Sequence, residues 1–109
     1  MKQYEIRWAH MPAPIGRRPV LLLTRTSAYA YLNKVIVAEV SRTVRGIPQE
    51  VDLGRKEGLS TASVVNLDNV HVVGKAVLGD RIGRLSSELQ REVKRALGYA
   101  LDWEELKTL

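Results

Sequence analysis

The amino-acid sequence predicts a mainly β protein, folded as a small, strongly curved barrel with one amphipathic helix at its C-terminal end. Short segments rich in Val, Ile and Leu recur along the first two thirds of the chain, separated by Gly, Pro, Asn or Ser. Several of these segments are apolar at nearly every position, which indicates burial on both faces. The last third of the chain shows apolar residues at helical spacing instead.

Six strands are expected before the helix. The first precedes a loop that contains two prolines and a glycine, and the second follows that glycine. The third follows a short connection at residues 27–33 that has room for one helical turn. Because residues 35–38 are all apolar, a curved barrel fits them better than a one-sided sheet. The strands are expected at about residues 5–9, 19–24, 34–41, 49–53, 63–67 and 70–73.

The C-terminal helix is expected to begin near Ser87. Ser87 with Gln90 fits a capping box, and Ser86 is an equally good N-cap. Gly98 inside the helix costs roughly 1 kcal/mol relative to Ala, so we expect the helix to fray or bend there. The apolar face is expected to consist of Leu89, Val93, Ala96, Leu97, Ala100 and Leu101, with Arg91, Lys94 and Arg95 on the other side.

Length and composition set limits on the kind of protein. A chain of 109 residues fits a single domain, which is expected to span residues 1–109. The net charge of +5 favours an anionic partner such as nucleic acid or an acidic protein. Cysteine is absent, which excludes disulfides and thiolate sites. With no long apolar run and no signal-peptide core at the N-terminus, a cytoplasmic protein without membrane contact is expected.

Motifs for metal or cofactor binding are not found. His10 and His71 are isolated, and no second ligand lies at metal-binding spacing from either. No glycine-rich phosphate loop or nucleophile elbow is present. We therefore expect neither a metal nor a cofactor.

The basic corner formed by Arg17, Arg18 and Pro19 is the best candidate for phosphate chemistry. Proline fixes its own φ and biases Arg18 away from helix, so the guanidinium is held on extended backbone. Cleavage of RNA without a metal needs a fixed cation for the phosphorane, and the planar arginine fork binds phosphate oxygens while staying charged. An ordinary surface arginine at a strand start is the alternative.

Ser41 ends the most apolar strand and could donate its hydroxyl to a phosphate oxygen, or simply cap a turn. Glu39 lies on the same face of that strand and is expected to point outward or to pair with Arg18. Arg42 and Arg45 follow in a loop that could track a nucleic-acid backbone or be a solvated turn.

Asn66 and Asp68 share one face of the fifth expected strand. Asp68 followed by Asn69 also fits an Asx-type turn between two strands. The residues alone leave both interpretations of Asp68 open.

The order and spacing of these segments resemble the MazF/PemK family of toxin endoribonucleases from bacterial toxin–antitoxin pairs. The likeness covers roughly residues 4–101. It is carried by Gly-Arg-Arg-Pro-Val at residues 16–20, Val-Ile-Val-Ala at 35–38, Gly-Leu at 58–59, Ser-Val-Val at 63–65 followed by Asp68, and Asp-Arg-Ile-Gly-Arg-Leu-Ser at 80–86. The resemblance implies an SH3-like barrel of the CcdB/PemK type with a C-terminal helix.

The resemblance also implies a homodimer that cleaves single-stranded RNA at short sequences without metal. The implied products carry a 2′,3′-cyclic phosphate and a 5′-hydroxyl. An antitoxin with a partly disordered, acidic segment is the implied partner, and such a segment suits the positive charge of this chain.

By position, Arg18 matches the catalytic arginine of the family, Ser41 stands where many members have a catalytic threonine, and Asp68 matches a carboxylate that some members are thought to use as general base. The resemblance therefore implies Arg18, Ser41 and Asp68 as catalytic residues, with Glu39 as the alternative base or the group that orients Arg18. The expected substrate-binding residues are Arg17, Glu39, Arg42, Arg45, Asn66 and His71.

The sequence also departs from the family pattern. Asn66 replaces an arginine that one branch of the family has, His71 replaces a usual cation, and the loop at residues 10–16 is short. Two alternatives follow: a catalytically inactive barrel that binds RNA, and a barrel similar to the CcdB gyrase poisons, which act on a protein. CcdB-like chains lack the Arg-Pro-Val corner followed by a strand-end hydroxyl.

Overall fold

The computed structural model describes all 109 residues, and most of them form a single antiparallel sheet with a helix on one side. The strands are β1 (Glu5–His10), β2 (Arg17–Leu22), β3 (Lys34–Ser41), β4 (Glu50–Leu53), β5 (Ser63–Gly74) and β6 (Leu78–Arg84). The α-helices are α1 (Ser87–Leu101) and α2 (Glu104–Lys107), and short 3-10 helices are η1 (Thr26–Ala30), η2 (Arg55–Glu57) and η3 (Lys75–Val77).

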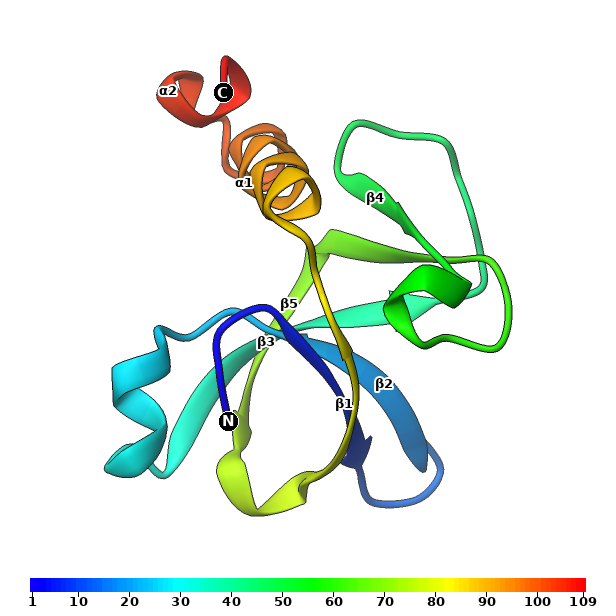
Figure 1. Ribbon diagram of the computed structural model, residues 1–109, viewed down its shortest axis with the longest axis vertical. Helices are drawn as coiled ribbons and strands as arrows, with labels where there is room; N and C mark the ends of the chain where they lie inside the picture. The colour runs from blue at the N-terminus through cyan, green and yellow to red at the C-terminus, as the bar shows by residue number, and fades with distance from the viewer.

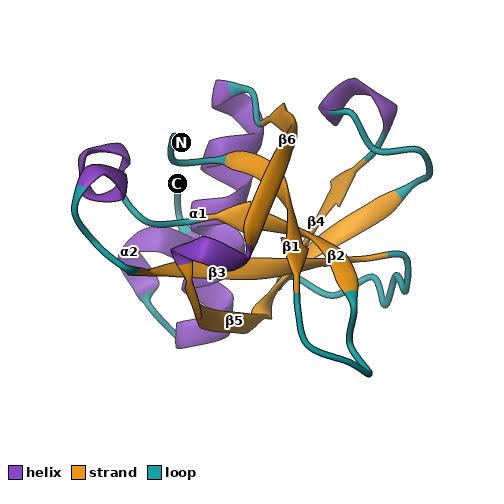
Figure 2. Cartoon of the chain, turned by 90° about the horizontal axis from the view of Figure 1, so that it is seen from below, coloured by secondary structure: helices purple, strands orange, loops and turns teal.

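The sheet has six strands in the order β4-β5-β3-β2-β1-β6, and every neighbouring pair is antiparallel. It curls strongly, and α1 packs against β4 and β5 (Figure 1). Figure 2 shows the same curl from a second side, with the helix along one flank of the strands. The expected mainly β class with a C-terminal helix is confirmed. The barrel is a half-barrel, because β4 and β6 are the edges of the sheet and do not pair with each other.

Two strand predictions are corrected by the structure. The expected break at Asp68 and Asn69 is wrong, because β5 runs continuously from Ser63 to Gly74. Residues 67–69 instead form an irregularity without partners in β3, since Ala38 pairs with Val70 and the next residue, Glu39, pairs with Asn66. Strand β6 was not expected from the sequence at all.

The helix prediction is confirmed in its apolar face, except that Leu101 is 59% exposed, and is refined at its ends. Ser86 is the N-cap, and its side-chain oxygen accepts a hydrogen bond of 3.2 Å from the Leu89 backbone N–H. The helix continues through Gly98 to Leu101, so the expected fraying at the glycine does not occur. A Cβ on Gly98 would lie 2.7 Å from the backbone nitrogen of Lys107. The glycine therefore allows the C-terminal segment to fold back closely against α1.

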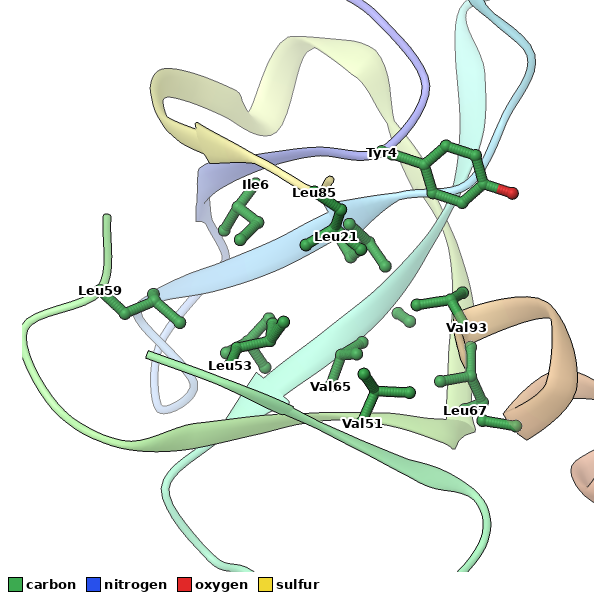
Figure 3. Close-up of a cluster of buried hydrophobic side chains, with 13 residues drawn as sticks. Tyr4, Ile6, Leu21, Val51, Leu53, Leu59, Val65, Leu67, Leu85 and Val93 are labelled. Carbon is green, nitrogen blue, oxygen red and sulfur yellow. The ribbon is translucent and has the colours of Figure 1, made fainter. Parts of the chain in front are cut away.

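The half-barrel has two hydrophobic cores, one on each face of the sheet. The larger lies between the inner face and α1 and includes Leu21, Ala38, Val40 and the helix residue Val93. Leu21 and Val93 are labelled in Figure 3. The smaller lies on the other face and contains Ala9, Val20, Leu22, Tyr29, Val35, Val37 and Val73. Strands β2 and β3 contribute alternate side chains to both cores, as their apolar runs predict.

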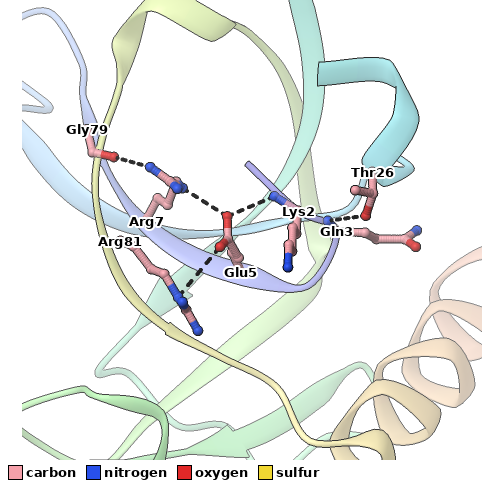
Figure 4. Close-up of polar contacts among 7 residues, drawn as sticks. All are labelled: Lys2, Gln3, Glu5, Arg7, Thr26, Gly79 and Arg81. Carbon is pink, nitrogen blue, oxygen red and sulfur yellow. Dashed lines mark hydrogen bonds and ion pairs between the residues drawn. The ribbon is translucent and has the colours of Figure 1, made fainter. Parts of the chain in front are cut away.

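A buried carboxylate ties the first strand to the last. Glu5 is 5% exposed, and its Oε1 accepts hydrogen bonds from the Lys2 backbone N–H at 2.8 Å and from Arg7 Nε at 3.1 Å (Figure 4). Its Oε2 lies 3.5 Å from Arg81 Nε in β6, and Arg7 also donates to the carbonyl oxygen of Gly79. These contacts fix the edge strand β6, whose two glycines and three charged residues bury little apolar surface.

Candidate functional site

A basic groove lies where β1, β2 and β3 end. It has a volume of about 580 Å³ and is lined by Arg17, Arg18 and Arg42 together with five hydroxyl-bearing side chains, those of Ser41, Thr43, Ser60, Thr61 and Ser63. Its apolar lining consists of Trp8, Ile15, Pro19, Val40 and Leu59. No aspartate or glutamate lines it. Three arginines and several hydroxyl groups line the groove, and its wall contains no carboxylate. This combination suits the binding of a polyanion.

Arg18 is held at the groove by the local backbone that the sequence predicts. It lies at the start of β2, directly before Pro19, and the ladder from β2 to β3 begins one residue later, at Val20. The missing N–H of Pro19 therefore leaves the β2–β3 ladder intact. The Arg18 side chain is 50% exposed, so most of its donors face solvent.

The expected pairing of Glu39 with Arg18 is confirmed. Arg18 Nη1 lies 3.8 Å from Glu39 Oε1, which is too long for a hydrogen bond and makes a loose ion pair. The other oxygen, Oε2, lies 2.6 Å from Nε2 of His71 on β5. Glu39 thus connects the arginine on β2 with the imidazole on β5 across three neighbouring strands.

Ser41 caps a turn at the end of β3, as one of the two interpretations predicted, and the donation of its hydroxyl to a phosphate oxygen stays a prediction. Its Oγ accepts a hydrogen bond of 3.0 Å from the Thr43 backbone N–H, as a strand-end serine that caps a turn does. It also lines the groove together with Arg18. Because Oγ serves as acceptor in this bond, the hydroxyl hydrogen stays available to donate to a ligand oxygen.

The loop after β3 presents one of its two arginines to the groove. Arg42 lines the groove, whereas Arg45 is exposed outside it. The carboxylate of Glu50 accepts hydrogen bonds from the backbone N–H groups of Arg45 and Gly46 at 2.9 and 3.0 Å. The loop is therefore fixed at its base by β4, and the side chain of Arg45 does not line the groove.

Asp68 lies outside the groove that contains Arg18 and Ser41, whereas Asn66 pairs with Glu39 in the β3–β5 ladder. Asn66 is 5% exposed, and its Oδ1 accepts a hydrogen bond of 2.8 Å from the Asp68 backbone N–H. Asp68 lines a second, mostly apolar groove of about 430 Å³, with Leu23, Ile36, Leu67, Val70, Leu97, Ala100 and Leu101. No hydrogen bond or ion pair joins Asp68 to Arg18 or Ser41 within this chain.

Trp8 is a groove residue that sequence reasoning missed. It lies opposite Pro19 in the β1–β2 ladder, and the guanidinium carbon of Arg17 lies 3.8 Å from the centroid of its ring. The sequence feature that could have identified Trp8 is the short loop at residues 10–16. Pairing of the two strands that flank this loop places the first tryptophan beside the basic corner. No group of three or more His, Asp or Glu side chains is arranged to hold a metal ion. No helix combines the length and apolar character needed to cross a membrane.

Chemically, the groove can bind a phosphodiester and stabilise charge on it. Arg18 offers a planar fork of donors, and Ser41 offers a neutral donor in the same groove. Glu39 and His71 can accept or donate a proton; Glu39 lies 3.8 Å from Arg18, and His71 contacts Glu39.

The family model of the PemK-like, MazF-like toxins of type II toxin–antitoxin systems matches residues 2–101. Among curated proteins, the probable endoribonuclease MazF5 of Mycobacterium tuberculosis is 41% identical over 99 residues, covering 90% of both chains. The endoribonuclease MazF3 of the same species is 40% identical over 88 residues, covering 79% of this chain and 85% of the relative.

Solved structures agree with this assignment. The Mycobacterium tuberculosis toxin MazF-mt6 superposes with a TM-score of 0.84 at 36% identity, covering 90% of this chain and 96% of that chain. A mycobacterial endoribonuclease in complex with its cognate antitoxin has the same fold, with a TM-score of 0.82 at 24% identity and coverage of 94% and 96%. The expected family is confirmed: the chain belongs to the PemK/MazF family of toxins from type II toxin–antitoxin systems, whose curated relatives are endoribonucleases.

Proposed function

We propose that this chain is an endoribonuclease toxin that cleaves single-stranded RNA at a short sequence without a metal ion. The observation that carries the proposal is the groove that Arg18 and Ser41 line together with Arg17 and Arg42, with no carboxylate in its wall. Its named relatives are endoribonucleases. The loose Arg18–Glu39 pair leaves the arginine free to change partner when a phosphate enters.

In the proposed reaction the ribose 2′-oxygen attacks the adjacent phosphorus while a base removes its proton. The O2′–P bond forms and the P–O5′ bond breaks, which leaves a 2′,3′-cyclic phosphate on one product and a 5′-hydroxyl on the other. Arg18 binds the phosphorane oxygens and supplies the proton or hydrogen bond to the leaving oxygen. Ser41 donates its hydroxyl to a phosphate oxygen. Arg18 supplies the charge that a metal ion supplies in other nucleases, so the reaction is proposed to need none.

Glu39 is the better supported of the two candidate bases. It contacts Arg18, whereas Asp68 lines the other groove. We propose that Glu39 orients Arg18 and, with His71, handles the proton of the attacking hydroxyl. The catalytic role of Asp68 stays a prediction, as do the roles of Arg45 in backbone binding and of Asn66 in base or ribose binding. Arg42, which lines the groove, is proposed to bind the RNA backbone.

Two protein partners complete the proposal. A cognate antitoxin is proposed to lay an acidic, partly disordered segment over the basic groove, since the net charge is +5 and a solved relative is in complex with its antitoxin. A second copy of the chain is proposed to cover the apolar groove between β3, β5 and α1. That groove adjoins the exposed apolar side chains of Ile36, Val70, Val72 and Leu101.

The proposal is tested by incubating the protein with a long single-stranded RNA in excess EDTA and mapping the ends of the products. We expect discrete cuts with 5′-hydroxyl ends, and a loss of several orders of magnitude in rate for Arg18→Ala. Because the Arg18 side chain is half exposed, the melting temperature of the Arg18→Ala protein should match that of the wild type. Intact RNA, or cleavage only after a divalent ion is restored, would contradict the proposal.

A further inference from the structure

The side chains of Trp8 and Arg17 form a flat stack at one end of the basic groove. The guanidinium carbon lies 3.8 Å from the ring centroid, much closer than the 5.9 Å of Arg25 over Tyr31, the other arginine–aromatic pair. At 3.8 Å the guanidinium lies in van der Waals contact with the indole. Both residues line the groove that contains Arg18.

The sheet holds this stack in place from below. Trp8 pairs with Pro19 and His10 pairs with Arg17 in the β1–β2 ladder, so Trp8 and Arg17 are diagonal neighbours on one face. Trp8 is half-buried in the middle of β1, which is fixed by β2 on one side and β6 on the other. The indole is therefore a rigid support, and Arg17 lies flat on it.

We propose that Arg17, supported by Trp8, forms a stacking subsite for a nucleobase next to the phosphate that Arg18 binds. This inference rests on the proposed function and assigns to Arg17 a role in reading bases rather than in neutralising phosphate. The unstacked bases of single-stranded RNA are commonly bound on aromatic rings or on the plane of an arginine guanidinium. An arginine already flat on a ring presents its second face without having to order itself on binding.

The surroundings of the stack favour a base over a second phosphate. The apolar side chains of Ile15 and Pro19 line the groove together with the stack, and Ile15 is 49% exposed. A flat apolar wall of this kind suits the faces and edges of a base. Arg17 and Arg18 are consecutive in β2, so their side chains leave the strand on opposite faces. One nucleotide therefore meets two arginines that approach it from different directions, one toward its phosphate and one toward its base.

The test uses the full chain with Trp103→Phe, which leaves Trp8 as the only tryptophan. The probe is a short single strand of 2′-O-methyl RNA of mixed sequence, which cannot be cleaved because the attacking hydroxyl is blocked. A second strand of the same length carries abasic sites. Tryptophan fluorescence and the dissociation constant are measured for the parent, for Arg17→Lys and for Arg25→Lys, the matched control outside the groove.

We expect the strand with bases to change the fluorescence of Trp8 and to bind about tenfold more weakly to Arg17→Lys. The abasic strand should bind equally to the parent and to Arg17→Lys, and the dependence of affinity on salt should be the same for the two. The reason is that lysine keeps the positive charge and lacks only the planar guanidinium. Arg25→Lys should match the parent in every measurement.

The subsite would be overturned if the strand with bases bound equally to the parent and to Arg17→Lys. It would also be overturned if Arg17→Lys lost the same affinity for the abasic strand as for the strand with bases. Failure of the proposed function is seen separately, in the EDTA cleavage assay with Arg18→Ala. If RNA is cleaved but Arg17→Lys shows no base-dependent effect, only the subsite proposal is rejected. If binding depends on the bases but no RNA is cleaved, only the proposed nuclease activity is rejected. No binding of either strand removes the subsite together with RNA as the substrate.

Discussion

Nε2 of His71 lies 2.6 Å from Oε2 of Glu39, and the other oxygen of the same carboxylate lies 3.8 Å from Arg18. The carboxylate is thus shared, and its closer partner is the imidazole. This arrangement places a carboxylate beside the proposed phosphate site, next to the arginine that is proposed to bind the phosphate.

We expect Glu39→Gln to separate these two effects. Removing the charge should tighten the binding of uncleavable RNA by a factor of up to about five, the range of an exposed ion pair. It should lower kcat at the same time, because Arg18 loses the partner that orients it. Glu105→Gln, which removes the same charge from exposed α2, is the control. A fall in affinity for Glu39→Gln would show that the carboxylate does not oppose phosphate binding.

Ser41 can be probed by removing its hydroxyl and by restoring it on a bulkier side chain. Ser41→Ala should lower kcat about 100-fold, the effect of removing one donor to the transition state. Ser41→Thr keeps the hydroxyl and should retain activity within a few-fold of the wild type. Single-turnover cleavage of one RNA by both variants is the measurement. Equal activity of Ser41→Ala and the wild type would leave Ser41 with its structural bond to Thr43 alone.

Stability at low pH should depend on Glu5. Its burial acts to raise the pKa, but hydrogen bonds from the Lys2 backbone and Arg7, with the charge of Arg7, lower the pKa below its ordinary value of 4.5. Because the folded-state pKa is depressed, the stabilisation is complete above about pH 4.5 and is lost as the pH falls through the folded value.

Glu5→Gln tests this prediction. At neutral pH its melting temperature should be lower, by an amount that corresponds to about 1–3 kcal/mol. The difference from the wild type should shrink as the pH falls from about 4.5 through the lower folded-state pKa, because the wild-type carboxylate becomes protonated first in the unfolded chain and then in the folded protein. A difference that stays constant down to strongly acid pH would mean that the charge of Glu5 does not stabilise the fold.

Gly83 is required by a close approach between β6 and η2. A Cβ at this position would lie 2.0 Å from the carbonyl oxygen of Glu57, and the backbone cannot move away without breaking the pairing with β1. Gly83→Ala should destabilise the protein by about 1–3 kcal/mol. Gly74→Ala is the matched control, because no atom lies within 4 Å of its added Cβ. Denaturant melts that give the same midpoint for the two variants would contradict the tight packing.

The apolar groove offers a test of the proposed dimer. Val72 is 64% exposed on β5 opposite Ile36, and Val44 is 55% exposed in the loop after β3. Val72→Asp should convert the protein to a monomer in light scattering, whereas Val44→Asp should leave the dimer unchanged, because only the first places a charge beside the proposed contact. A wild-type monomer at high concentration would remove the dimer from the proposal.

The strands that hold the site could be predicted because their apolar runs end in clear punctuation. Strand β2 begins after Gly16, and β3 ends at Ser41, within a residue or two of the expected positions. The alternation along β3 also predicted that Glu39 and Ser41 share a face, and the Glu39–Arg18 contact followed from it. These features are local, so sequence pattern suffices to find them.

The features that were missed depend on contacts between distant segments. Strand β6 contains Gly79, Gly83 and several charges, and it is a strand because β1 pairs with it and Glu5 holds it. The irregularity in β5 at residues 67–69 depends on the register against β3. The Trp8–Arg17 stack likewise needs the register of β1 against β2. A register is set by the whole sheet, and no short segment carries its signature.

The two cores restrain strands β2 and β3, whereas the loops around the groove are free to vary in sequence. Strands β2 and β3 are clamped from both faces, by residues such as Leu21 on one and Val37 on the other, so the ends that carry Arg18 and Ser41 have a fixed separation. The rest of the groove wall comes largely from the loops that contain Ile15, Thr43 and Ser60, whose side chains belong to neither core. On the proposed function, changes in these loops would alter which RNA sequence is admitted while the proposed catalytic residues at the strand ends are preserved, so a toxin with a new target can arise without redesign of that centre.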